Sequence, residues 1–128
     1  MEEAKIIKIN ELSWQKLKAD FTDIPLYDKS LANDPKTGME INVSKYPKGF
    51  KLDLHSHTCS HGMYVIEGKL KTSIGTVEKG DFAWFPAGTK MFHGATCEED
   101  CVFLFITNAP FDITYYNEDG STREKPEV

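Results

Sequence analysis

The chain has 128 residues with a formal net charge of −5, and 40% of the residues are hydrophobic and 27% charged. This length and composition predict one soluble domain that is large enough to bury a core. The sequence shows no basic run or patch, so nucleic acid and anionic membranes are excluded as expected partners.

The N-terminus and the cysteines indicate the compartment. Residues 1–5 contain no positive region followed by an apolar stretch, so no secretory signal is expected. The longest apolar run, residues 102–106, is too short to span a bilayer. The three cysteines, Cys59, Cys97 and Cys101, form no paired framework. We therefore expect reduced thiols in a cytoplasmic protein.

Residues 1–38 are expected to form an N-terminal strand or arm that packs on the body of the protein. A strand is predicted over residues 5–9, and Trp14 and Leu17 are expected to anchor the segment. Turn formers dominate residues 22–38, so this stretch is predicted to be irregular and to end in a turn at residues 34–38.

After Gly38 the sequence changes to short β runs separated by turns. Strands are predicted over residues 39–46, 50–57, 63–66, 69–74 and 82–85. Glu67-Gly68 is typical of a tight hairpin between the third and fourth of these strands. Lys79-Gly80-Asp81 marks another turn.

Two more strands are predicted near the C-terminus. Residues 101–106 are apolar at every position, which indicates a strand buried on both faces. Residues 111–116 are rich in β-branched and aromatic residues, and residues 117–128 form a polar tail. Because no strong helical periodicity occurs, the chain is predicted to be all-β, a sandwich or barrel formed by residues 39–116.

All four histidines of the chain lie between positions 55 and 93. His55 and His57 are separated by one residue on a predicted strand, so both imidazoles point to the same face. His61 is in phase with Met63 at the start of the next strand, and His93 comes from a later one. If the fold brings these strands together, the four rings can surround one metal ion, because imidazole is a common metal ligand.

The residues around these histidines resemble the two motifs of the cupin superfamily. Gly49 is followed by five residues, His55-Ser-His57, three residues, His61, six residues and Gly68. The second motif begins at Gly80, which is followed by five residues, Pro86-Ala-Gly88, four residues and His93. The resemblance implies a single cupin β-barrel, a jelly-roll-like double-stranded β-helix. It also implies one divalent metal ion per chain, held by His55, His57, His61 and His93.

Two positions depart from the family pattern. His61 stands where many cupins have a glutamate ligand, and Glu67 lies too far along the strand to replace it. His93 comes two residues late, with Met91 in the expected place. Either a longer loop or a shift by one pleat keeps His93 on the inner face, and the following Gly94 favours the longer loop.

Three further stretches, residues 12–17, 34–38 and 98–113, look like the ChrR-like branch of the cupins. That branch includes acetylacetone-cleaving dioxygenases and anti-sigma-factor domains. The resemblance favours a non-haem Fe(II) dioxygenase-like enzyme that acts on a small carbonyl compound, since neutral ligands leave the ion electrophilic. Two alternatives stay open: a metal-containing ligand-binding or regulatory module without catalysis, and an isomerase that uses Zn²⁺, Mn²⁺ or Ni²⁺. No catalytic residue beyond the ligands is indicated, and cupins are commonly homodimers.

The surroundings of the motifs leave three smaller questions. Four apolar residues near the motifs either line a substrate pocket or belong to the core: Trp84, Met91, Phe103 and Phe105. If they line a pocket, they favour a small, fairly apolar substrate. Cys59 lies between His57 and His61 and either approaches the metal or has no role. Residues 50, 52 and 54 are apolar on the face opposite His55, so either a bulge near Leu54 re-aims the chain or both faces are covered.

Overall fold

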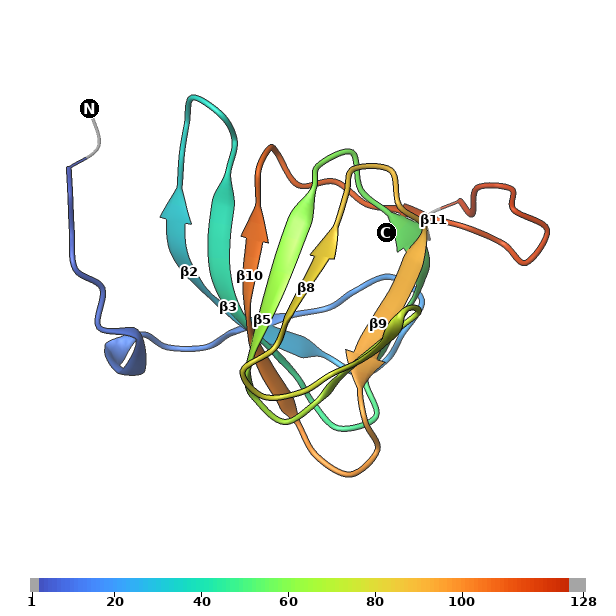
Figure 1. The fold of residues 1–128 in the computed structure, drawn as a ribbon, viewed down its shortest axis with the longest axis horizontal. Coiled ribbons are helices and arrows are strands. Elements are labelled where there is room, and N and C mark those ends of the chain that lie inside the picture. Colours follow the sequence, from blue (N-terminus) through green and yellow to red (C-terminus); the bar gives the residue numbers. More distant parts are fainter. Residues whose placement is uncertain (1–2, 125–128) are drawn as a thin grey trace.

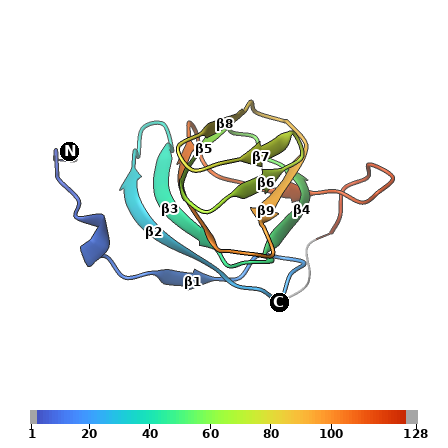
Figure 2. The same ribbon diagram turned by 60° about the horizontal axis from the view of Figure 1, so that its bottom comes forward.

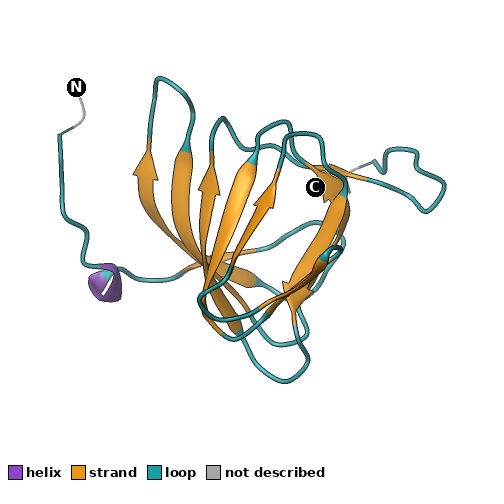
Figure 3. Cartoon of the chain, in the orientation of Figure 1, coloured by secondary structure: helices purple, strands orange, loops and turns teal. Residues whose placement is uncertain are grey.

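The computed structural model describes residues 3–124, and these form two antiparallel β-sheets that curve around one core (Figures 1 and 2). Strands dominate the described chain, and its one helix is a single 3₁₀ turn, η1, at Ile9–Glu11 (Figure 3). The described residues contain no helix with the length and apolar character needed to cross a bilayer. The predicted all-β class is therefore confirmed.

The larger sheet has the strand order β1-β2-β3-β10-β5-β8. Its strands are β1 (Gln15–Leu17), β2 (Leu26–Asn33), β3 (Glu40–Tyr46), β10 (Cys101–Thr107), β5 (His61–Glu67) and β8 (Phe82–Phe85). The smaller sheet has the order β11-β4-β9-β6-β7. Its strands are β11 (Thr114–Tyr115), β4 (Lys51–Ser56), β9 (Met91–Ala95), β6 (Leu70–Thr72) and β7 (Gly75–Val77).

The N-terminal segment differs from the prediction in two places. The strand expected over residues 5–9 is absent from the described chain. These residues pair with no other strand, and the chain forms η1 at their end instead. Conversely, the stretch expected to be irregular contains β2, which is paired with β3 on one side and β1 on the other. Trp14 contacts the larger sheet, because the ammonium groups of Lys29 and Lys45 lie 4.6 Å and 5.9 Å from the centre of its ring, whereas Leu17 is 42% exposed.

The predicted hairpin at Glu67-Gly68 is wrong. β5 and β6 follow each other in sequence but belong to different sheets, so Gly68 turns the chain from one sheet to the other. Gly68 has a φ of 73°, and a Cβ atom there would lie 2.1 Å from the carbonyl oxygen of Asp100. The glycine is needed for this corner, not for a two-stranded turn. The real hairpin of this region joins β6 to β7 through Ser73 and Ile74.

The strand that carries the first histidines contains the bulge considered from sequence. The register between β4 and β9 shifts between Leu52 and His55. One extra residue on the bulged strand reverses which side chains point inward. As a result Leu52 and His55 are both buried, at 8% and 0% exposure, although simple alternation would put them on opposite faces.

β10 runs through the centre of the larger sheet, between β3 and β5. Its burial alternates: Cys101, Phe103, Phe105 and Thr107 are buried, whereas the residues between them are half-buried. The expectation that this strand is buried on both faces is therefore wrong for the half-buried face, and the face that contains Phe103 and Phe105 is the one turned to the core.

The C-terminal segment closes the open side of the smaller sheet. β11 pairs with β4 opposite His55 and Ser56. Beyond it, Tyr116 forms an isolated bridge with Thr122. The Arg123 guanidinium donates to the Asp53 carboxylate at 3.2 Å. The part of the expected tail up to residue 124 is thus attached to the body, and residues 125–128 lie outside the described part of the chain.

Candidate metal centre

The fold brings all four histidines into the space between the two sheets. His55 belongs to β4, His57 follows that strand directly, His61 is the first residue of β5, and His93 lies in β9. Their exposures are 0%, 4%, 0% and 2%. Gly94 lets β9 approach β4 closely, since a Cβ atom there would lie 2.2 Å from the Phe50 carbonyl oxygen.

Three of these histidines form a compact group. One ring nitrogen from each of His55, His57 and His93 lies within 4.8 Å of the others. The ring centroid of His55 is 4.8 Å from that of His57 and 4.7 Å from that of His93. Three imidazole nitrogens this close can share one divalent ion, so these residues are positioned to bind a metal.

Each ring of the group is held by its Nδ1 atom, which leaves Nε2 free. His55 Nδ1 lies 2.6 Å from the Asp53 carbonyl oxygen, and His57 Nδ1 is hydrogen-bonded to the carbonyl oxygen of Asp112. His93 Nδ1 lies 3.0 Å from the hydroxyl oxygen of Tyr46. The three Nε2 atoms are buried and have no hydrogen-bond partner among the described residues. A buried polar atom without a partner is costly, and a metal ion at this point would remove that cost.

His61 lies beside the group without belonging to it. Its ring centroid is 4.8 Å from that of His57 and 6.4 Å from that of His93. Both of its ring nitrogens are buried and lack a partner in the described chain. Its ring packs against Phe85 and Phe105, at 5.1 Å and 5.3 Å between centroids. No hydrogen bond from the described residues fixes the orientation of this ring, so both of its nitrogens are available as ligands.

Burial sets the charge of the cluster. The pKa of His55 is lowered to about 4 and that of His61 to about 3. Desolvation is the main cause in both cases, and the neighbouring histidines contribute to the lowering. Burial likewise lowers the pKa of His57 and puts that of His93 well below its usual value. All four rings are therefore neutral at pH 7, which is the form that binds metals.

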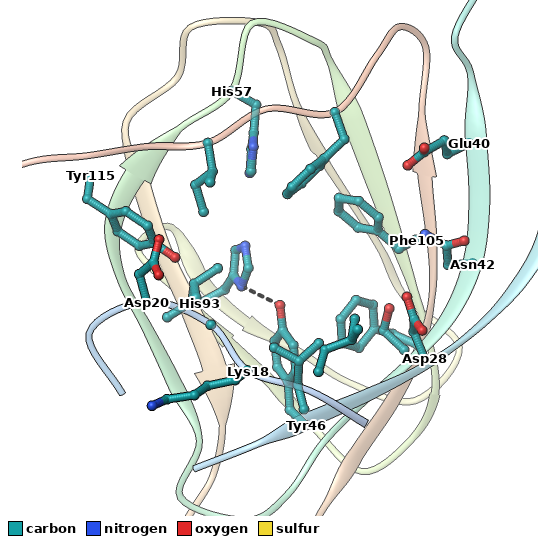
Figure 4. Close-up of a pocket in the computed structure, with 18 residues that line it drawn as sticks. Lys18, Asp20, Asp28, Glu40, Asn42, Tyr46, His57, His93, Phe105 and Tyr115 are labelled. Carbon is teal, nitrogen blue, oxygen red and sulfur yellow. Dashed lines mark hydrogen bonds between the residues drawn. The ribbon is translucent and has the colours of Figure 1, made fainter. Parts of the chain in front are cut away.

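A cavity of about 400 Å³ opens beside the histidines (Figure 4). His57 and His93 line one side of it, and Phe103 and Phe105 form part of its wall. Residues 17–20 of the N-terminal arm also lie along it, so the arm covers part of the cavity. A space of this size next to a cluster of free imidazole nitrogens can hold a small molecule in reach of a bound ion.

The four side chains proposed for the pocket have different positions. Phe103 and Phe105 line the cavity, and Met91 is buried in the core at 1% exposure without lining it. Trp84 is 52% exposed on the outer face of β8, because Ala83 and Phe85 take the inward positions of that short strand. Trp84 therefore does not contribute to this cavity.

Cys59 is buried at 2% exposure and is not part of the three-histidine group. Burial raises the pKa of its thiol, so it carries a proton at pH 7 and lacks the thiolate that metals prefer. The structure gives this residue no role at the site.

Sequence reasoning did not identify the polar side of the cavity. Glu40, Asn42, Ser44 and Tyr46 alternate along β3 and all line it, with Asp28 of β2 beside them. The signal was present as polar residues two apart in a predicted strand. It was overlooked because only the apolar residues between them were considered as the inward-facing set.

Two facing sheets of short antiparallel strands, with a histidine cluster and a cavity between them, define a jelly-roll-like fold with a candidate metal site. The family model described as the ChrR cupin-like domain matches residues 2–112. The chain therefore belongs to the ChrR cupin-like family, as its motifs indicated. No protein with a curated description matches the sequence.

Solved structures agree on the fold. An RmlC-like cupin protein of Ralstonia eutropha superposes with a TM-score of 0.78 at 18% identity, over 97% of this chain and 79% of that one. A protein of Methylibium petroleiphilum with the provisional name acetylacetone dioxygenase gives a TM-score of 0.76 at 18% identity, over 98% and 92%. The structure of Rhodobacter sphaeroides SigE with the anti-sigma factor ChrR gives a TM-score of 0.64 at 16% identity, over 78% of this chain and 51% of that one. At these identities the similarity shows the fold alone.

Proposed function

We propose that this protein is a non-haem Fe(II) dioxygenase-like enzyme that acts on a small carbonyl compound. The observation that carries the proposal is the group of three neutral histidines whose free Nε2 atoms meet beside a cavity of about 400 Å³. The Methylibium petroleiphilum structure, with its provisional dioxygenase name, supports the same choice of reaction.

Three histidines would hold the metal ion, and three other residues would orient them. His55, His57 and His93 hold the ion, with Asp53, Asp112 and Tyr46 fixing the orientation of their rings through Nδ1. When bound, Fe(II) supplies Lewis acidity toward substrate oxygen atoms and one-electron chemistry with dioxygen.

The remaining walls bind the substrate and exclude water. Phe103, Phe105 and Phe111 surround its apolar part, and the arm residues 17–20 limit solvent access. We include His61 in the proposal as a fourth ligand, because its two unpartnered nitrogens lie next to His57. With an octahedral ion, four histidines still leave two open positions.

Oxygen uptake tests the proposal. Protein loaded anaerobically with Fe(II) should consume oxygen when supplied with acetylacetone or a related diketone or keto acid. The variant His55→Ala should lose both iron and uptake, whereas Cys59→Ala should keep them. Iron-loaded protein that consumes no oxygen with any such compound would contradict the proposal.

A regulatory role is the second candidate, and the structural similarity to a complex of SigE with the anti-sigma factor ChrR favours it. In that case the site would hold Zn²⁺ with all four histidines and no open position. A diketone should then raise the melting temperature of the zinc-loaded protein without turnover. Oxygen consumption coupled to loss of the diketone would exclude this candidate.

We also propose that the protein is a homodimer. The outer face of β5 and β8 carries four exposed apolar side chains, Tyr64, Ile66, Phe82 and Trp84. Tyr64 is directly opposite Phe82, and β8 is the edge strand of the sheet. Such a face on an open edge favours self-association. Sedimentation equilibrium should give a dimer and Phe82→Lys a monomer; a monomeric unsubstituted protein would contradict this.

The proposed location is the cytoplasm, and the cysteines support it. Cys59, Cys97 and Cys101 are all free, with the first and last buried, as expected in a reducing compartment.

A further inference from the structure

The cavity has one polar wall, opposite its histidines. Glu40, Asn42 and Ser44 lie on one face of β3, and Asp28 lies on the neighbouring strand β2, directly opposite Ser44 in the register. Figure 4 places Glu40, Asn42 and Asp28 on the side of the cavity away from His57 and His93. The Asp28 carboxylate therefore lies remote from the metal centre, whereas Glu40 lies at the level of His61, because both pair with Thr107 of β10.

This wall has unused hydrogen-bonding capacity. The side chains of Asp28, Asn42 and Ser44 form no hydrogen bond or ion pair with other residues in the described part of the chain. Glu40 accepts one bond, from Asn33 Nδ2 at 3.3 Å, which leaves its second oxygen free. Ser44 is buried at 7% exposure, and burial raises the pKa of Asp28. These side-chain atoms are not among the fully buried unpartnered atoms, so water reaches them, and a ligand that supplies hydrogen-bond donors can replace that water.

The other charged residues along the cavity do not neutralise this wall. Lys18 lines the cavity with its stem, but Figure 4 shows its ammonium group directed away from the cavity and from Asp28. Asp20 lies across the cavity beside Tyr115 and adds a further negative charge. Among the described residues that line the cavity, no cationic side chain faces Asp28, so its negative charge at the end formed by β2 and β3 is not neutralised.

The opposite end offers a different chemistry. His57 and His93 line the cavity, and their Nε2 atoms are buried and have no partner among the described residues. Phe103 and Phe105 lie between these histidines and the polar wall on the larger sheet, since Phe103 pairs with Ser44 and Phe105 with Asn42 across the strands. The cavity thus has a metal-binding end, an apolar middle and an anionic end.

We propose that the cavity selects a carbonyl compound that carries a cationic amine at the end opposite its metal-binding oxygen atoms. The ammonium group donates to Asp28, with Ser44 and Asn42 as further acceptors, and the chain between the two ends packs on Phe103 and Phe105. This inference rests on the metal site of the proposed function and names its substrate class. It replaces the fairly apolar substrate expected from sequence with one that is polar at both ends.

Hydroxamates of equal size provide the test, because they chelate a metal through two oxygen atoms. β-Alanine hydroxamate, butyrohydroxamate and succinic monohydroxamate differ only in an ammonium, methyl or carboxylate group at the far end. Binding of each, and of its longer homologues, to cobalt-loaded protein under nitrogen would be followed through the visible spectrum. The ammonium compound of the best length should bind about tenfold more tightly than the methyl compound, as one charge-assisted hydrogen bond predicts. The carboxylate compound should bind most weakly.

Two variants locate the effect. Asp28→Asn should remove most of the preference for the ammonium compound while leaving the affinity for butyrohydroxamate within about twofold, since the methyl end makes no charged contact. Glu118→Gln, an exposed carboxylate outside the cavity, should leave all affinities unchanged. Ser44→Ala, which removes the hydroxyl group opposite Asp28, provides a second test if Asp28→Asn does not fold.

The outcomes separate the inference from the function on which it rests. Equal affinities for the three end groups, or an ammonium preference that survives both Asp28→Asn and Ser44→Ala, would overturn the inference and leave the metal site intact. Failure of every hydroxamate to bind cobalt-loaded protein would overturn both. An ammonium preference in a protein whose iron form consumes no oxygen would support the ligand class and contradict the dioxygenase.

Discussion

The imidazole of His93 is joined to the hydroxyl group of Tyr46, with 3.0 Å between Nδ1 and the phenolic oxygen. His93 lies in the smaller sheet and Tyr46 in the larger one, so this bond links the two sheets at the metal centre. When Nε2 binds an ion, Nδ1 carries the ring proton and donates a hydrogen bond to the tyrosine oxygen. The hydroxyl group then has its own proton available for a molecule in the cavity, which Tyr46 also lines.

Replacing Tyr46 by Phe should weaken metal binding by about tenfold to a hundredfold, because His93 loses the acceptor that orients its ring. The phenylalanine ring keeps the packing on Phe50 and Phe103, whose centroids lie 4.5 Å and 4.7 Å away. Competition with a chromophoric chelator measures the affinity. Tyr64→Phe, which removes an exposed hydroxyl, is the control. Equal affinities of Tyr46→Phe and the unsubstituted protein would show that this bond does not support the ligand.

His61→Leu should lower metal affinity at least about tenfold if His61 is a fourth ligand. X-ray absorption of the zinc-loaded protein should then show one imidazole fewer. Phe85→Leu alters the packing of the same ring without removing a nitrogen, so it controls for steric effects. If His61→Leu keeps both its affinity and its imidazole count, His61 is not a ligand and the site is an open three-histidine centre.

The metal-free protein should lose stability as the pH falls from about 6.5, the value expected for an unfolded histidine. Burial lowers the pKa of folded His55 to about 4 and of His61 to about 3. Between these values and about 6.5 the unfolded chain binds protons that the fold excludes, so stability is complete above this window and declines within it. Each fully excluded proton contributes a slope of up to about 1.4 kcal/mol per pH unit.

Urea unfolding of chelator-treated protein at a series of pH values measures this slope. His61→Leu, which has one histidine fewer to protonate, should show a shallower decline than the unsubstituted protein. Stability that is constant from about pH 6.5 to about pH 5 would contradict the buried, neutral state assigned to the cluster.

Gly68→Ala should destabilise the fold by about 3 kcal/mol or more, since it combines backbone strain with a clash. The added Cβ atom would lie 2.1 Å from the Asp100 carbonyl oxygen. Gly120→Ala is the matched control: its φ of 89° is also positive, but no atom lies within 4 Å of the added carbon. It should cost only about 1–2 kcal/mol. If thermal unfolding shows equal losses of stability for the two variants, the backbone at Gly68 moves readily enough to accommodate the added carbon, which would contradict the prediction.

His55 and His57 could be predicted as a pair because their spacing on one strand is a local signal, whereas His93 could be predicted only through the resemblance of its surroundings to the second cupin motif. At His55 the sequence leaves two alternatives open, and only the pairing of β4 with β9 identifies the bulge, since it depends on a strand far along the chain. The same holds for the ring of Tyr46, whose contact with His93 spans 47 positions.

The errors have a common physical cause. β2 contains Asp28 and Asn33, which disfavour strands, yet pairing on both sides stabilises it. Asp28 can face inward only because a cavity, and not a packed core, lies beside it. At Glu67-Gly68 the sequence predicts a turn correctly but does not specify the sheet that each neighbouring strand joins. Pairing partners and cavities are properties of the whole fold, so local sequence patterns do not determine them.

Metal analysis of the purified protein, combined with anomalous scattering from its crystals, tests the central claim most directly. We predict one divalent ion per chain, bound by the Nε2 atoms of His55, His57 and His93 at the edge of the cavity. A correctly folded protein that, after incubation with Fe(II), Zn²⁺, Mn²⁺ or Ni²⁺, shows no ion and no anomalous peak among these histidines would contradict it.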